Sequence, residues 1–200
     1  MPEGKTMAGN TANGGGRRGS RWRIAAWAAV PLILLLPLVA MQFTDEVNWD
    51  VADFAIFGAL LVGVGFTYEL TAKMRGDTAY RAAVGLALAA AFLLVWVNGA
   101  VGIIGSENND ANLMYYGVLA VGIIGAFIAR FQPRGMARAL LATALAQASV
   151  AVVALIAGLG VPYSGPLEIL ALNGFFVALF VGSAMLFREA ARRRPEQGAA

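Results

Sequence analysis

The chain contains no histidine and no cysteine. Histidine-ligated haem, the usual zinc sites, internal disulfides and the Ser-His or cysteine nucleophiles of hydrolases therefore have no residues to form them. No apolar segment carries the two acids of an intramembrane aspartyl pair, and no Walker loop or dinucleotide fingerprint occurs at a strand-to-helix junction. We therefore expect a protein that is not an enzyme and that binds no metal and no cofactor.

Charge is also scarce, since 14% of the 200 residues are charged whereas 59% are hydrophobic. The apolar residues occur in six long blocks, and a helix needs about 20 such residues to cross a hydrocarbon core of about 30 Å. The apolar-polar alternation of membrane barrel strands is absent from all six blocks. The sequence predicts an all-α bundle of six transmembrane helices. The predicted spans are 24–43, 51–71, 82–104, 113–131, 136–159 and 166–187.

The basic residues lie on one side of this pattern. All fifteen Lys and Arg residues precede the first span, join the second to the third, join the fourth to the fifth, or follow the sixth. Short loops rich in Lys and Arg remain in the cytoplasm, so both termini are predicted to be cytoplasmic. The opposite side carries acids without basic partners: Asp45, Glu46, Asp50, Asp53, Glu107, Asp110 and Glu168.

Three regions follow from this pattern. Residues 1–22 are predicted to be a disordered basic tail, because their Gly, Asn, Ala, Thr and Ser residues bury little apolar surface. Residues 23–188 form the transmembrane domain, and residues 189–200 form a basic cytoplasmic tail. An alternative is that the first span is a cleaved signal peptide, which would leave five spans. Its apolar run exceeds the roughly 7 to 15 residues of a signal core, which favours an uncleaved span.

Small residues predict where helices approach closely. The string Ala-Val-Gly-Ile-Ile-Gly occurs at 100–105 and again at 120–125, and a small-residue ladder with four-residue spacing lies in the sixth span. Small residues let helix backbones approach and gain van der Waals contact. The predicted packing positions are Gly102, Gly105, Gly122, Gly125, Gly174, Ala178 and Gly182.

Polar residues within the spans are few. Asn98, Gln147 and Asn173 either bond across to a neighbouring helix or line a path for a solute. Glu69 precedes Lys73 by four positions, which favours a helical ion pair over a proton-relay role.

The acidic side is a candidate cation-binding rim, because carboxylate and carbonyl oxygens bind hard cations and an acidic mouth concentrates cations. No segment has the ligand spacing of a calcium loop, and exclusion of positive charge from this side explains the pattern equally well. The candidate binding residues are Asp50, Asp53, Asn98, Glu107, Gln147, Glu168 and Asn173.

The segments 47–50 (Val-Asn-Trp-Asp), 68–70 (Tyr-Glu-Leu) and 97–109, which begins Val-Asn-Gly, resemble small multi-pass inner-membrane proteins of unknown function found in proteobacteria. The resemblance covers most of residues 22–188. It implies a location in the bacterial inner membrane and transfers no activity.

Two classes of function remain. The first is a non-catalytic membrane protein, an accessory subunit or oligomeric scaffold, whose partners would be the lipid bilayer and either itself or a larger membrane complex, with no nucleic acid. The second is a small transporter or channel for a cation or small solute, with the acidic rim as its periplasmic entrance.

Overall fold

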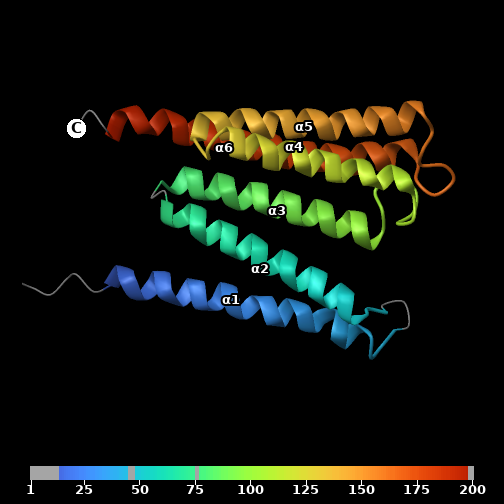
Figure 1. Ribbon diagram of the computed structural model, residues 1–200, viewed down its shortest axis with the longest axis horizontal. Helices are drawn as coiled ribbons and strands as arrows, with labels where there is room; N and C mark the ends of the chain where they lie inside the picture. The colour runs from blue at the N-terminus through green and yellow to red at the C-terminus, as the bar shows by residue number, and fades with distance from the viewer. Residues whose placement is uncertain (1–13, 45–47, 75–76, 198–200) are drawn as a thin grey trace, which may run out of the picture. The chain divides into compact units, whose positions relative to one another are not determined.

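The computed structural model describes residues 14–44, 48–74 and 77–197. Within these ranges the chain forms six α-helices and one short 3-10 helix, with no strand, which confirms the all-α prediction (Figure 1). The elements are α1 (Gly14–Ala40), α2 (Val51–Met74), α3 (Thr78–Ala100), η1 (Asp110–Leu113), α4 (Met114–Ile128), α5 (Pro133–Ile156) and α6 (Pro166–Gln197).

Five helical segments of the described chain are long and apolar enough to cross a membrane. The apolar part of α1 in these residues, Trp27–Ala40, is shorter. The prediction of a multi-pass membrane protein is therefore confirmed at this level, and the count of six spans stays a prediction. The five segments are Val51–Thr71, Thr78–Ala100, Asp110–Ile128, Pro133–Ile156 and Pro166–Arg193.

The chain divides into two compact units, Met1–Gly65 and Phe66–Ala200. In the first unit, α1 packs along the first part of α2: a Cβ added to Gly58 would lie 3.6 Å from a methyl carbon of Leu34. Before α2, the ring of Trp49 packs edge-on against Phe57, with ring centroids 5.4 Å apart.

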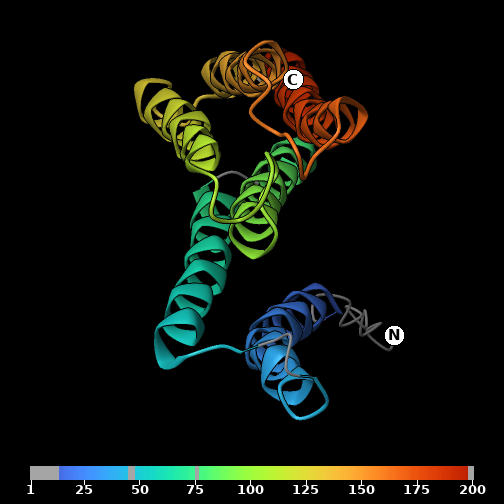
Figure 2. The ribbon, with the colours of Figure 1, turned by 90° about the vertical axis from the view of Figure 1, so that its right-hand side faces the viewer.

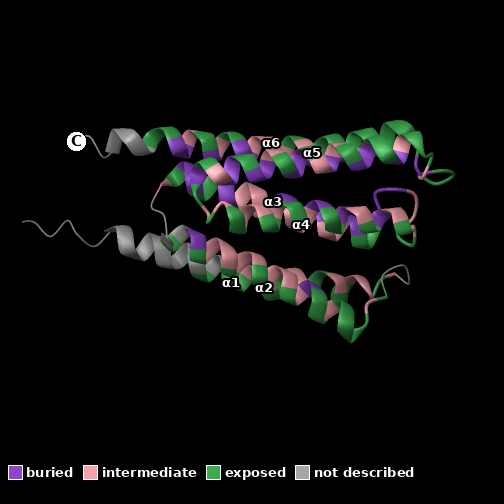
Figure 3. Cartoon of the chain, turned by 45° about the horizontal axis from the view of Figure 1, so that its top comes forward, coloured by how far each residue is buried: buried purple, intermediate pink, exposed green. Residues whose placement is uncertain are grey.

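The second unit contains the end of α2 and all of α3 to α6. From α3 onward, consecutive helices run antiparallel; α5 packs against both α4 and α6, and α6 also packs against α3 (Figures 1 and 2). The contact between α3 and α4 is much smaller. Buried residues lie along α3, α5 and α6 (Figure 3), and the largest include Tyr80, Leu94, Phe176 and Phe187.

Glycine and alanine allow α4 and α5 to approach closely. A Cβ added to Gly125 would lie 2.7 Å from the Cβ of Ala139, and one added to Gly122 would lie 3.1 Å from the hydroxyl of Thr143. Both glycines therefore lie where α4 and α5 approach each other. On α6 the predicted ladder divides: a Cβ added to Gly182 would lie 3.5 Å from a methyl carbon of Leu86 on α3.

The other two ladder positions on α6 face outward. Ala178 is exposed, and a Cβ added to Gly174 would meet no atom of the described chain within 4 Å. The sequence leaves open whether this ladder faces inward or a second subunit, and within this unit Gly174 and Ala178 face outward. The reason is geometric, because the side of α6 that holds Phe176 and Phe180 turns toward the core and leaves these small residues on the outside.

Two helices extend into predicted tails. α1 begins at Gly14, so residues 14–22 are helical where a disordered tail was predicted, and residues 1–13 lie outside the described residues. α6 continues past the predicted end at residue 187 to Gln197. The extension is held by an ion pair between Arg193 and Glu189 at 2.9 Å and by burial of Ala190. A helix propagates readily from an existing helical segment, because nucleation is the costly step.

Candidate functional site

The candidate site lies at the end of the second unit where α3 passes into α4. The sequence predicted a helix through residue 104. In the structure α3 ends at Ala100, so residues 101–104 are not helical. Gly102 and Gly105 both have φ of +73°, a left-handed conformation that glycine adopts without steric cost. The prediction that these two glycines pack helices together is wrong, because they instead turn the chain. A Cβ added to Gly102 would lie 2.6 Å from the carbonyl carbon of Ser106.

Asn112 organises this loop from within. Its side-chain oxygen accepts hydrogen bonds from the backbone N–H groups of Ile103 at 3.1 Å and Ile104 at 3.0 Å. Its amide nitrogen donates to the carbonyls of Ile104 at 3.3 Å and Ser106 at 2.8 Å. Ile103 and Ile104 are fully buried, so this one side chain satisfies backbone groups that water does not reach.

The loop is also bonded to the connection between α5 and α6. The Ser164 hydroxyl accepts a hydrogen bond from the Gly105 N–H at 3.1 Å and donates to the Gly105 carbonyl at 3.3 Å. The Asn109 amide donates to the carbonyl of Leu159 at 2.8 Å, while its oxygen accepts from the Ala111 N–H. The two connections at this end of the unit are therefore held together by side-chain hydrogen bonds.

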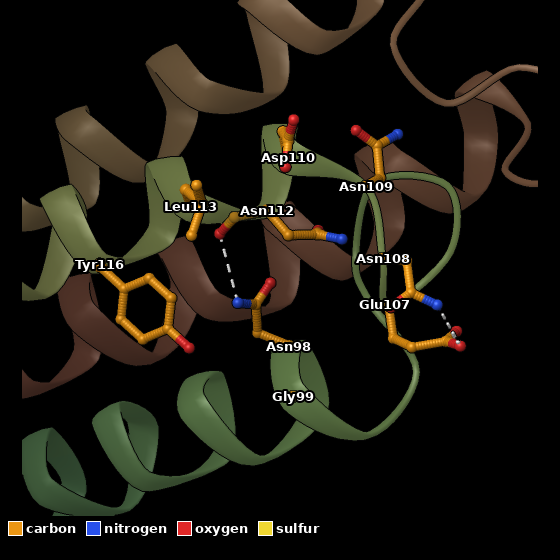
Figure 4. A pocket seen from close by; sticks show the side chains of 9 residues that line it. All are labelled: Asn98, Gly99, Glu107, Asn108, Asn109, Asp110, Asn112, Leu113 and Tyr116. Atoms are coloured by element: carbon orange, nitrogen blue, oxygen red, sulfur yellow. Dashed lines mark hydrogen bonds between the residues drawn. The ribbon is translucent and has the colours of Figure 1, made fainter.

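A polar pocket of about 270 Å³ lies between the loop and the ends of α3 and α4 (Figure 4). Amide, carboxylate and aromatic side chains form its wall, and no Lys or Arg contributes to it. Its lining residues are Asn98, Gly99, Glu107, Asn108, Asn109, Asp110, Asn112, Leu113 and Tyr116.

Asn98 forms the deep part of this pocket. Its side chain points from α3 toward Asn112, whose backbone carbonyl accepts a hydrogen bond from the Asn98 amide nitrogen at 3.2 Å (Figure 4). Asn98 is 5% exposed, and its side-chain oxygen has no hydrogen-bond partner in the described structure. Buried polar atoms are nearly always bonded, so this oxygen is an acceptor that the fold leaves open.

The acidic residues of the pocket lie at its rim. Glu107 and Asp110 are both exposed, and Glu107 accepts a hydrogen bond from the Asn108 amide at 3.0 Å. In the described part of the chain, no group of three or more His, Cys, Asp or Glu residues is arranged to hold a metal ion.

The predicted binding residues divide between several places. Asn98 and Glu107 line the same pocket. Gln147 and Asn173 bond to each other instead: the Gln147 amide donates to the Asn173 oxygen at 2.9 Å, and the hydroxyl of Tyr115 donates to the same oxygen at 3.1 Å. All three of these side chains are buried. They link α4, α5 and α6, as the interhelical interpretation predicted.

The remaining acids have local roles or stand apart. Asp50 and Asp53 form a reciprocal cap at the start of α2, each carboxylate accepting the other's backbone N–H at 2.9 Å. Glu168 is exposed in the first turn of α6. The predicted ion pair of Glu69 with Lys73 is present at 3.8 Å. Asp45 and Glu46 lie outside the described residues.

Sequence reasoning missed four important polar residues. They are Asn112 and Ser164 in the outer loops, Tyr115 in the α4–α6 contact, and Ser183, whose hydroxyl donates to the Ala83 carbonyl at 2.7 Å between α6 and α3. A signal for Asn112 exists in the sequence, because Asn108, Asn109 and Asn112 follow Gly102 and Gly105, and both residue types favour turns.

Comparison with protein-family models, curated proteins and solved structures finds no match to this chain.

Proposed function

We propose that the chain is a non-catalytic integral membrane protein of six spans, an accessory subunit or oligomeric scaffold. We place it in the bacterial inner membrane with both termini in the cytoplasm. The proposal rests above all on how the second unit uses its intramembrane polar side chains.

These side chains bond the helices to one another. Gln147, Asn173 and Tyr115 are each 0–1% exposed and share one hydrogen-bonded cluster. Ser183 is fully buried and bonds α6 to α3. A transport path is expected to present polar groups to a water-filled cavity. This buried interhelical cluster instead supports a rigid packing role, and it is the observation that favours a scaffold over a transporter.

The outward face of α6 offers a surface for association. Gly174 and Ala178 are one helical turn apart and both are exposed. Lipid tails are as apolar as the side chains, so the hydrophobic effect does not drive helices together within a membrane. Small residues promote helix contact there, because they let the two backbones approach closely. A second membrane helix is the partner that this face fits.

Oligomeric state provides the test. Purified protein in mild detergent is analysed by size-exclusion chromatography with light scattering, together with mass spectrometry of whatever co-elutes. We expect a complex larger than one chain, reduced to a monomer by Ala178→Leu and unaffected by Leu145→Ala, which alters an exposed site on α5. A wild-type protein that elutes as a lone monomer would refute the proposal.

Topology is tested separately. In the described chain, basic side chains cluster at the end of the second unit where α3 and α5 begin and α4 and α6 end, whereas Glu107, Asp110 and Glu168 lie at the other end. This separation supports the predicted orientation. Fusions of green fluorescent protein to each terminus should fluoresce, while alkaline phosphatase fused at either terminus should stay inactive. Active phosphatase at a terminus would overturn the orientation.

A further inference from the structure

The pocket at the α3–α4 end contains an unmet hydrogen-bonding demand. Exchanging the nitrogen and oxygen of the Asn98 amide would not give its oxygen a donor. The nitrogen donates to the Asn112 carbonyl, and the exchange would place the Asn98 oxygen against that carbonyl oxygen, so that two acceptors would face each other. The Asn98 oxygen is therefore fixed as an acceptor without a donor in the described structure. A ligand with an O–H or N–H group would supply the missing bond at the deep end of the pocket.

The rim of the pocket sets the charge of such a ligand. Glu107 and Asp110 give the lining two carboxylates, and no lining residue is basic. This rim would repel an anion. It would attract a cation, which can contact the carboxylate oxygens directly. The ligand should therefore carry positive charge at one end and a neutral donor at the other.

The walls and volume limit its size. Leu113 and Tyr116 add apolar and aromatic surface to the lining, and an aromatic face also attracts cations. The volume of about 270 Å³ lies just below the range of about 300 to 1,000 Å³ typical of pockets for drug-sized ligands. A short aliphatic chain suits these dimensions better than a ring system.

We propose that this pocket binds a small organic ammonium compound that carries a second hydrogen-bond donor. The ammonium group lies at the rim that carries Glu107 and Asp110, and the second donor bonds to the side-chain oxygen of Asn98. This binding role goes beyond the scaffold function and does not depend on it.

The first test uses the unaltered protein and a matched set of four-carbon probes. Isothermal titration of the detergent-purified full chain compares 4-amino-1-butanol with butylamine, which lacks the hydroxyl, and with 1,4-butanediol, which lacks the charge. We expect 4-amino-1-butanol to bind about tenfold or more tightly than either analogue, because each analogue loses one of the two polar contacts. Equal affinities for aminobutanol and butylamine, or no binding of either amine, would overturn the proposal.

The second test uses variants. The double variant Glu107→Gln with Asp110→Asn should weaken aminobutanol binding about tenfold or more, while Glu168→Gln, an acid at the same end but outside the pocket, should leave it unchanged. Asn98→Leu should remove the preference for aminobutanol over butylamine in a protein whose circular dichroism matches the wild type. If Asn98→Leu does not fold, the probe comparison on the wild type still decides the question.

Calcium chloride is titrated alone as the competing ligand. The proposal predicts no saturable calcium binding that depends on Glu107 and Asp110. Such binding, combined with the absence of amine binding, would assign the rim to a metal ion and refute the ammonium site.

Discussion

Replacing Asn112 with alanine should strongly destabilise the second unit. The Asn112 oxygen accepts the N–H groups of Ile103 and Ile104, both at residues with no exposed surface. A buried donor that loses its acceptor costs about 1 to 3 kcal/mol, so the two together predict a loss of about 2 to 6 kcal/mol in the free energy of unfolding. The lower figure applies if water enters the space left by the amide.

The measurement is unfolding of the purified protein by sodium dodecyl sulfate in mixed micelles, followed by circular dichroism. Asn108→Ala is the matched control, because Asn108 is exposed and its side chain bonds to the exposed Glu107. The control should change the free energy of unfolding by less than about 0.5 kcal/mol. An Asn112→Ala protein as stable as this control would refute the assignment of Asn112 as the organiser of the loop.

Three further changes test the helix contacts of the same unit in the same assay. Gly125→Ala should destabilise by about 1 to 3 kcal/mol, because the new Cβ would lie 2.7 Å from another Cβ on α5, whereas Gly117→Ala meets no atom within 4 Å and should be neutral or stabilising. A tolerated Gly125→Ala would contradict the close approach. Asn173→Leu should cost about 2 to 6 kcal/mol, because it leaves two buried side-chain donors without their acceptor, and a loss below about 1 kcal/mol would argue against the cluster. Ser183→Ala should cost about 0.6 to 1.7 kcal/mol through its lost interhelical bond, while Ser149→Ala, whose hydroxyl bonds within its own helix, should have little effect; equal losses would count against the α3–α6 bond.

The positions of the long helices could be predicted because each depends on local composition. About 20 consecutive apolar residues are a sufficient signal for a membrane-spanning helix, and five such segments are present in the described chain. Helix ends are harder to predict. The segment 188–197 is basic and was predicted to be a tail, but α6 continues through it. Charged residues also occur within helices, where they form ion pairs such as the one between Arg193 and Glu189, so a basic composition does not mark a helix end.

The repeated hexapeptide shows why one helix end was mispredicted. The same six residues form a turn with left-handed glycines at 100–105 and a regular helix at 120–125. Twenty residues beyond Asn112, the equivalent position after the second copy holds Gln132, which is the N-cap residue of α5. The difference therefore comes from tertiary bonds to Asn112, which composition does not reveal.

The candidate site was predicted in part for a related reason. Asn98 and Glu107 were among the predicted binding residues and do share a pocket, but Gln147 and Asn173 bond to each other elsewhere. Which polar residues face one another depends on the rotation of each helix about its axis. A helix that is apolar on all sides, as these are, carries little information about that rotation.

The hydrogen bonds among the outer connections constrain how the second unit can move. Ser164 and Asn109 tie the α3–α4 hairpin to the α5–α6 hairpin at one extremity, and the hydroxyl of Ser183 on α6 donates to the Ala83 carbonyl on α3 toward the opposite extremity. Alternating access commonly requires one group of helices to rock against another. Rocking of one hairpin against the other would break interhelical hydrogen bonds at both extremities at once. We therefore expect the four helices α3 to α6 to move as one block.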